Sequence, residues 1–166
     1  MPWKIDLVLM LRSIIGDLDK AKFTDERIKQ ILVVGAYNVL NDADFSETYT
    51  VNVAAVSISP DPITEKDTDF STLTVYKSAC ILLGSEVKTE AANAISIKDG
   101  PSAIDLRGVT ANLTNLYNDL CAKYDALLKT YQYNNTLVGQ AILGPYSPGS
   151  MVVNGNQFDH RGNLFN

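Results

Sequence analysis

The chain has 166 residues, of which 46% are hydrophobic, and it carries a formal net charge of −5. This length predicts one domain with at most an appendage, and the apolar content is sufficient for a buried core. No apolar run approaches the roughly 18 residues of a membrane span, so we expect a soluble chain. Asp6 and Arg12 interrupt the apolar start and no small-residue cleavage site follows. We therefore expect a helix there rather than a signal peptide, in a protein made and used in a cytoplasm.

The negative charge is concentrated in one segment. Residues 41–69 contain seven carboxylates, with Lys66 as the one basic residue, which leaves the rest of the chain about neutral. No basic patch is available to neutralise phosphates, and this argues against tight nucleic-acid binding. The acidic residues of the segment are Asp42, Asp44, Glu47, Asp61, Glu65, Asp67 and Asp69.

Two helices are predicted in the N-terminal part. The first covers about residues 4–15 and ends at Gly16. It is apolar over so much of its circumference that it needs cover from more than one neighbour, in this chain or in another copy. The second begins after Thr24, a favourable N-cap, and ends at residues 41–42. Gly35 within it costs about 1 kcal/mol relative to alanine, which suggests a close helix crossing.

An extended strand is predicted next. Residues 48–59 are uncharged and rich in β-branched side chains, and two prolines soon after them end the strand. Such a strand needs a partner, either a hairpin later in the chain or a neighbouring subunit by strand addition. Asp67 or Asp69 can then cap a third helix that begins near Phe70.

The central feature is a helix, a hairpin and a longer helix between residues 70 and 131. Apolar residues recur in each helix at steps of three and four, so the two helices should pack antiparallel. Alternating apolar residues on both sides of Gly100 predict a hairpin at about 95–106. Cys80 and Cys121 lie in or beside the stripes, and we expect buried reduced thiols. The stripes are Leu73, Tyr76, Cys80, Leu83 and Val87, and Leu113, Leu116, Leu120, Tyr124, Leu127 and Tyr131.

Residues 133–166 are predicted to form an extended C-terminal docking arm. They combine glycine, proline and asparagine with scattered apolar residues. The segment is thus too apolar for a free linker and too rich in helix breakers to fold alone. We expect it to become ordered on another subunit. The arm residues expected to bind this partner are Tyr133, Leu137, Val138, Ile142, Leu143, Tyr146, Met151, Val152, Phe158 and Phe165.

The sequence contains no catalytic signature. His160, the one histidine, lies in the arm, and there is no Gly-rich phosphate loop, zinc spacing or credible catalytic base. We expect no enzymatic activity and no cofactor. The alternative from another class is a divalent-metal-binding domain or metal-dependent hydrolase, with four carboxylates between residues 61 and 69 as the metal ligands. The simpler interpretation of these carboxylates is an acidic loop followed by a helix N-cap. This group is Asp61, Glu65, Asp67 and Asp69.

Two other groups have simple structural interpretations. Glu86 and Glu90, one helical turn apart, are expected on a solvent-exposed helix face. The tyrosines near the end of the last helix are better explained as core or interface residues than as a platform for nucleic-acid bases. They are Tyr117, Tyr124, Tyr131 and Tyr133.

Together these elements predict a mainly α fold. We expect a small antiparallel bundle of about four helices with a short β-hairpin, an extended strand segment and a long irregular C-terminal arm. Residues 1–132 would form the helical domain, with the strand insertion at about 48–59 and the hairpin at about 95–106, and residues 133–166 would form the arm.

The order of these elements resembles the head-to-tail connector, or adaptor, proteins of tailed bacteriophages. The resemblance covers roughly residues 5–131. It is carried by the stretch Phe-Thr-Asp-Glu-Arg-Ile-Lys-Gln-Ile-Leu around Thr24, the hairpin at 95–106 and the final helix ending at Tyr131. It implies a structural virion protein that forms a ring, usually a dodecamer, between the portal of the head and the tail, and that extends the DNA channel. A stopper or tail-completion protein of the same neck is the alternative within this class.

The resemblance also implies partners and a location. The partners are the portal protein, a tail or stopper protein and other copies of the chain, with DNA only as passing cargo and no membrane. The location is the neck of the virion, after assembly in the host cytoplasm. A ring needs two different apolar faces on each subunit, which the surplus helix surface and the unpaired strand would supply. Asp42, Asp44 and Asp61 could face the channel, where a lining that repels phosphate lets DNA pass.

Overall fold

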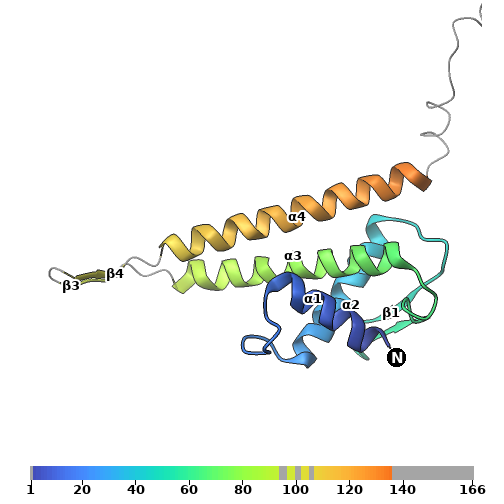
Figure 1. Ribbon diagram of the computed structural model, residues 1–166, viewed down its shortest axis with the longest axis horizontal. Coiled ribbons are helices and arrows are strands. Elements are labelled where there is room, and N and C mark those ends of the chain that lie inside the picture. The colour runs from blue at the N-terminus through green and yellow to red at the C-terminus, as the bar shows by residue number, and fades with distance from the viewer. Residues whose placement is uncertain (1, 94–96, 100–101, 105–106, 136–166) are drawn as a thin grey trace, which may run out of the picture. The chain divides into compact units, whose positions relative to one another are not determined.

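The computed structural model describes residues 2–93, 97–99, 102–104 and 107–135, and it has the mainly helical architecture expected from the sequence (Figure 1). The helices are α1 (Trp3–Ile15), α2 (Asp25–Asp42), α3 (Thr68–Asn93) and α4 (Arg107–Asn135). The strands are β1 (Thr50–Asn52), β2 (Ser57–Ser59), β3 (Ile97–Asp99) and β4 (Ser102–Ile104). The chain divides into two units, residues 1–131 and 132–166, and the fold described below is that of the first.

The ends of α1 and α2 follow the local signals in the sequence. Gly16 ends α1 in the left-handed region, with φ of +74°, and its backbone N–H donates to the Arg12 carbonyl. Thr24 is the N-cap of α2, because its side chain accepts a hydrogen bond from the Arg27 N–H at 3.3 Å. Both predicted boundaries are therefore confirmed.

The core is built by α1, α2 and α3, and the close crossing predicted at Gly35 is confirmed. A Cβ placed on Gly35 would collide with the Ser78 hydroxyl and lie 3.1 Å from the Thr74 carbonyl oxygen, both on α3. Ser78 donates hydrogen bonds to the carbonyl oxygens of Thr74, at 2.6 Å, and Ile31 of α2, at 3.3 Å. The missing side chain at Gly35 thus allows the Ser78 hydroxyl of α3 to contact the backbone of α2.

The prediction of one continuous strand over residues 48–59 is wrong, because this segment folds back on itself as two short strands. β1 and β2 form an antiparallel pair in which Val51 lies opposite Ile58. The Asn52 side chain accepts a hydrogen bond from the Ala55 N–H at 2.9 Å, and Val56 adopts a φ of +49°. The Asn side chain stabilises a turn in the middle of the predicted strand. The segment therefore supplies its own partner and is not a single unpaired strand.

Aromatic rings connect the beginning of α3 to the segment that follows α2 and to α4. The Tyr49 ring stacks on Phe70, with centroids 4.0 Å apart, and Phe45 meets Phe70 edge-on at 5.1 Å. The Tyr131 ring of α4 stacks on Phe45, with ring centroids 4.9 Å apart. Asp67 caps α3, since its Oδ1 accepts from the Phe70 N–H at 2.9 Å, as predicted.

The helix, hairpin and helix predicted in the second half are confirmed as α3, the β3–β4 pair and α4. In the pair, Ile97 lies opposite Ile104. α3 and α4 run side by side (Figure 1) and are joined by a disulfide between Cys80 and Cys121, with Cα atoms 5.3 Å apart. The prediction of reduced thiols is thus wrong, because the packing of α4 on α3 brings together two cysteines that are far apart in sequence.

The apolar stripe predicted for α4 is partly wrong. Leu120 is 8% exposed and Tyr124 is 3% exposed, but Leu116 is 41% exposed. Tyr117 takes the place expected for Leu116, because its ring lies about 3.0 Å from the position of a Cβ on Gly84 of α3. The buried and partly buried positions of α4 therefore follow a heptad, in which the partly buried Tyr117 and Tyr131 lie seven residues before and after the buried Tyr124.

Leu120→Ala should lower the free energy of unfolding by about 2–5 kcal/mol, because it leaves a cavity between α4 and α3. Leu116→Ala is the matched control and should change it by less than about 0.5 kcal/mol, as expected for an exposed position. Urea denaturation of both variants measures the difference. Equal effects at the two positions would contradict the phase of α4 described above.

Candidate functional site

The three aspartates proposed to face a channel lie in different surroundings. Asp42 ends α2 and is half-buried, Asp44 is exposed, and Asp61 is half-buried near the beginning of α1. The Asp44 backbone carbonyl accepts a hydrogen bond from the Tyr131 hydroxyl at 2.9 Å. The structure is that of a single chain, so the position of the three aspartates relative to the channel of an assembled ring stays a prediction. Of the three, Asp44 has the carboxylate most exposed to solvent.

Asp42 links three helices. Its Oδ2 accepts hydrogen bonds from the Tyr124 hydroxyl of α4 at 2.6 Å and from Lys77 Nζ of α3 at 2.9 Å. Burial alone would raise the pKa of Asp42, but these hydrogen bonds and the Lys77 charge outweigh it and lower the pKa. Burial and the Asp42 carboxylate raise the pKa of Tyr124. Asp42 therefore remains ionised and helps to fix α4 against α2 and α3.

The group proposed as a metal site has hydrogen bonds to the protein itself. Asp61 accepts from the backbone N–H groups of Trp3, at 3.3 Å, and Ile63, at 3.1 Å. Asp67 accepts from the Tyr49 hydroxyl at 2.9 Å as well as capping α3. Within the described ranges, no three His, Cys, Asp or Glu side chains are grouped so that they could hold a metal ion. These contacts favour the interpretation as a loop with helix caps.

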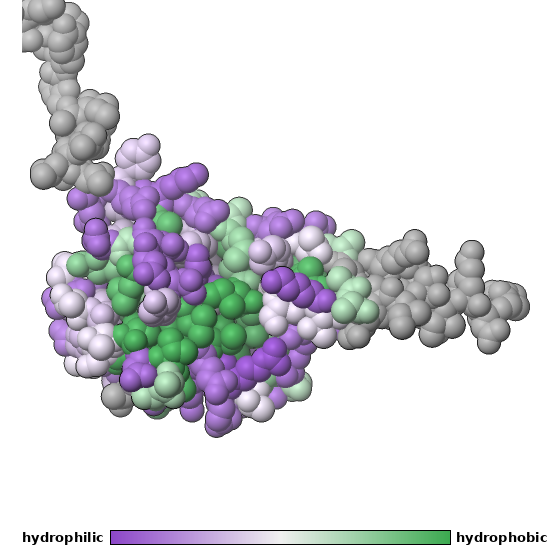
Figure 2. Space-filling view, turned by 180° about the vertical axis from the view of Figure 1, so that it is seen from behind, coloured by the Kyte–Doolittle hydropathy of each residue, from purple (hydrophilic) through white to green (hydrophobic). Residues whose placement is uncertain are grey.

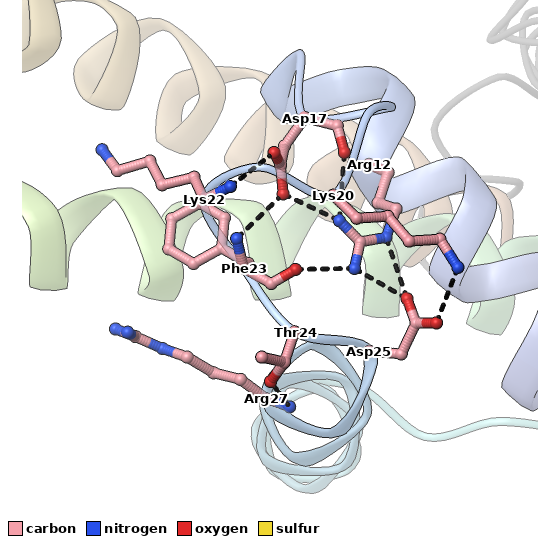
Figure 3. Close-up of polar contacts among 8 residues, drawn as sticks. All are labelled: Arg12, Asp17, Lys20, Lys22, Phe23, Thr24, Asp25 and Arg27. Carbon is pink, nitrogen blue, oxygen red and sulfur yellow. Dashed lines mark hydrogen bonds and ion pairs between the residues drawn. The ribbon is translucent and has the colours of Figure 1, made fainter.

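A polar cluster around Arg12 connects α1 to the loop before α2 (Figure 3). Arg12 is 2% exposed, and its guanidinium donates to Asp17 Oδ2 and Asp25 Oδ1, each at 2.7 Å. It also donates to the carbonyl oxygens of Asp17, at 3.0 Å, and Phe23, at 2.8 Å. A buried guanidinium is stable only when it is paired in this way. The sequence indicated Arg12 only as a charge that interrupts an apolar run.

The two aspartates in this cluster are held in their ionised form. The backbone N–H of Lys22, then that of Phe23 and the Arg12 guanidinium lower the pKa of Asp17, against the effect of burial. The hydrogen bond from Lys20, followed by that from Arg12, lowers the pKa of Asp25. The cluster thus consists of opposite charges that satisfy one another, and this is the geometry of a structural joint rather than of an acid-base site.

The prediction of an exposed helix face at Glu86 is wrong. Glu86 is 8% exposed, and its carboxylate lies 2.9 Å from Lys22 Nζ and 3.5 Å from a guanidinium nitrogen of Arg27. These contacts tie α3 to the loop before α2 and to the beginning of α2. The prediction failed because the partners lie about sixty positions earlier in the chain.

The arm residues fall mostly outside the described part of the chain. Tyr133 lies within α4, which continues to Asn135, so the irregular arm does not begin at residue 133 as predicted. Its side chain is 71% exposed. The residues outside the described part are Leu137, Val138, Ile142, Leu143, Tyr146, Met151, Val152, Phe158 and Phe165.

The outer face of α1 is apolar and uncovered. Ile5 and Leu9, one turn apart, are 71% and 58% exposed, and the adjoining Met10 is 49% exposed. Met10 also lines a hollow of about 250 Å³ with Pro62 and Ile63. We call Ile5 and Leu9 the α1 apolar face; Met10 lies about 100° further round the helix, beyond Asp6. Figure 2, which views the molecule from the side opposite to Figure 1, shows a further apolar area that is bordered by polar residues. Clusters of this kind on a surface commonly mark an interaction site.

Comparison of the chain with known proteins does not assign it to a family. The chain matches no family model, no curated protein and no solved structure. None of the helices within the described residues is both long enough and apolar enough to cross a membrane.

Proposed function

We propose that this chain is a structural virion protein, a subunit of an adaptor ring between the portal of a phage head and the tail. The observation that carries the proposal is the α1 apolar face. α1 buries Leu7 and Leu11 against its own bundle, while Ile5 and Leu9 remain in solvent. A subunit in a ring uses different faces to contact the copies on its two sides. The neighbouring copy is the occupant that we assign to this face.

The arrangement of the second half also supports this proposal. The β3–β4 pair lies between two long helices, of 26 and 29 residues, which is the order of elements that the resemblance to connector proteins rests on. The Asp42 and Arg12 contacts fix the helices without any group poised for proton transfer. A helical body with uncovered apolar surface is suited to assembly.

The acidic segment has a role in this proposal as the lining of the DNA channel. Asp44 is the best candidate for this lining. It is exposed, and it forms no ion pair with any Lys or Arg in the part of the chain that the structure describes. Asp42 contributes less negative charge, since Lys77 lies against it. A negative lining repels the phosphate backbone and keeps DNA from adhering to the wall.

Leu9→Asp should raise the protein concentration needed for assembly at least about tenfold. Burying a leucine side chain is worth roughly 1.5–3 kcal/mol, and 1.4 kcal/mol corresponds to a factor of ten. Sedimentation velocity over a concentration series, with and without portal rings, measures this change. The matched control is Gln30→Asp, which adds the same charge at an exposed position of α2.

Two outcomes of this experiment would count against the proposal. One is unchanged assembly of Leu9→Asp, which would mean that the α1 apolar face does not contact a neighbour. The other is equal loss in Gln30→Asp, which would indicate a general effect of charge. The thermal unfolding of both variants should match that of the parent chain, because both positions are exposed.

A further inference from the structure

The attachment of α4 depends on few buried side chains. Between residues 111 and 135, where the side chains of α4 are described, only Leu120 and Tyr124 are buried. α3, in contrast, buries Phe70, Leu73, Val75, Ala79, Leu82 and Leu83. The hydroxyl of Tyr124 on Asp42 and the ring of Tyr131 on Phe45 add further contacts. Apart from the polypeptide that connects Asn93 to Arg107, the disulfide is the one covalent connection between α3 and α4 within the described residues.

The disulfide is placed where a small thiol can reach it. Cys80 and Cys121 are both half-buried rather than fully enclosed. Cys80 lines a groove of about 710 Å³ together with Gly84, Tyr117 and two lysines, Lys77 and Lys88. Lys77 is paired with Asp42, so Lys88 supplies the positive charge of this groove, and such charge favours the thiolates that enter and leave in an exchange reaction. A structural disulfide sealed in a core would lack such an approach.

We propose that the Cys80–Cys121 disulfide is a redox-controlled latch that closes α4 onto α3 and opens when a small-molecule thiol reduces it. The thiolate of the reductant attacks the Cys80 sulfur from the groove, the Cys121 thiolate leaves and takes up a proton, and a mixed disulfide remains on Cys80. A second thiol then attacks this mixed disulfide and releases Cys80. Overall, two small thiols are oxidised to one disulfide and the protein gains two thiols.

The latch couples the surface of the protein to its surroundings. A reducing cell interior favours the open form, and an oxidising exterior favours the closed form. In the open form α4 is held only by its noncovalent contacts, so Leu120, Tyr124 and the partly buried residues beside them become intermittently available to a partner. The chain can thus present the α4 stripe during assembly and withdraw it afterwards. This inference concerns α4 alone and does not depend on the identity of the partner.

Hydrogen exchange of the full chain, oxidised and then reduced with dithiothreitol, tests the latch. Alkylation and mass measurement must first count no free thiols before reduction and two after it. We expect the backbone amides of residues 113–131 to exchange at least about tenfold faster after reduction, because local opening controls their exchange. The amides of Leu32, Val33 and Val39 in α2 serve as the internal control and should keep their rates.

Two variants separate the latch from a purely structural bond. Cys80→Ser with Cys121→Ser should show fast exchange of α4 in either redox condition. Tyr124→Phe, which removes the hydroxyl that contacts Asp42, should increase α4 exchange much more in the reduced than in the oxidised protein. The proposal is overturned if the oxidised chain retains two free thiols or if α4 exchanges at the same rate in both states. It is equally overturned if reduction accelerates α2 as much as α4, since that would mean global unfolding.

Discussion

Arg12→Ala is expected to lower the free energy of unfolding by about 3–5 kcal/mol, the range for breaking a buried ion pair by removing one partner. The substitution leaves the carboxylate of Asp17, which is 8% exposed, without its guanidinium. It also removes the donors that satisfy the carbonyl oxygens of Asp17 and Phe23. The joint between α1 and the loop before α2 should therefore loosen, and chemical denaturation measures the loss.

The matched control is Arg27→Ala. Arg27 carries the same charge on the neighbouring helix, but its side chain is 49% exposed and its ion pair with Glu86 is 3.5 Å long. Glu86 keeps its shorter contact with Lys22 when Arg27 is removed, and the Arg27 side chain itself is exposed, so the effect should be several times smaller. If the two variants lost the same stability, the Arg12 cluster would not be the structural joint that its geometry indicates.

Deletion of residues 136–166 is expected to abolish attachment to the portal or tail partner while the helical unit stays folded. The cut follows Asn135, the last residue of α4, so no described element is shortened. The deleted segment contains Leu137, Phe158 and Phe165 among other apolar residues, and a segment of this composition gains stability by ordering on a partner. Circular dichroism should show unchanged helix melting, and co-sedimentation with portal rings should show no binding.

Two double substitutions test whether attachment depends on the apolar residues of the arm or only on its length. Phe158→Ser with Phe165→Ser should weaken attachment, whereas Asn154→Ser with Asn156→Ser should leave it unchanged. Full incorporation of the truncated chain into particles would show that docking occurs elsewhere, with the α1 apolar face as the next candidate.

The sequence predicted the features that depend on neighbouring residues. Thr24 and Gly16 set helix ends through contacts within four residues, and such contacts are visible in the local sequence. Gly35 was recognised as a crossing because glycine inside a helix is costly unless a neighbour approaches closely. The helical fold followed from apolar periodicity, which reports the buried face of a helix directly.

Two predictions of local structure failed, each for its own reason. Val56 at positive φ is an uncommon conformation for a β-branched residue, so the turn between β1 and β2 had no signal beyond Asn52. The apolar stripe of α4 was assigned to Leu116 because leucine is more apolar than Tyr117, yet the heptad spacing selects the tyrosine.

The polar and covalent contacts of the candidate site were missed for another reason. The disulfide joins residues separated by 41 positions, and Glu86 pairs with Lys22 and Arg27 from a different helix and loop. Tertiary structure alone creates these pairs. The proposed roles of the arm and of the acidic lining depend on contacts with other molecules. These roles therefore stay predictions.

Negative-stain electron microscopy of the purified protein, alone and mixed with portal rings, tests most directly the claim that this chain assembles through its uncovered apolar surface. We expect closed rings with an open centre, seated coaxially on the portal. Particles of single-subunit size at every concentration, with portal rings left bare, would contradict the account.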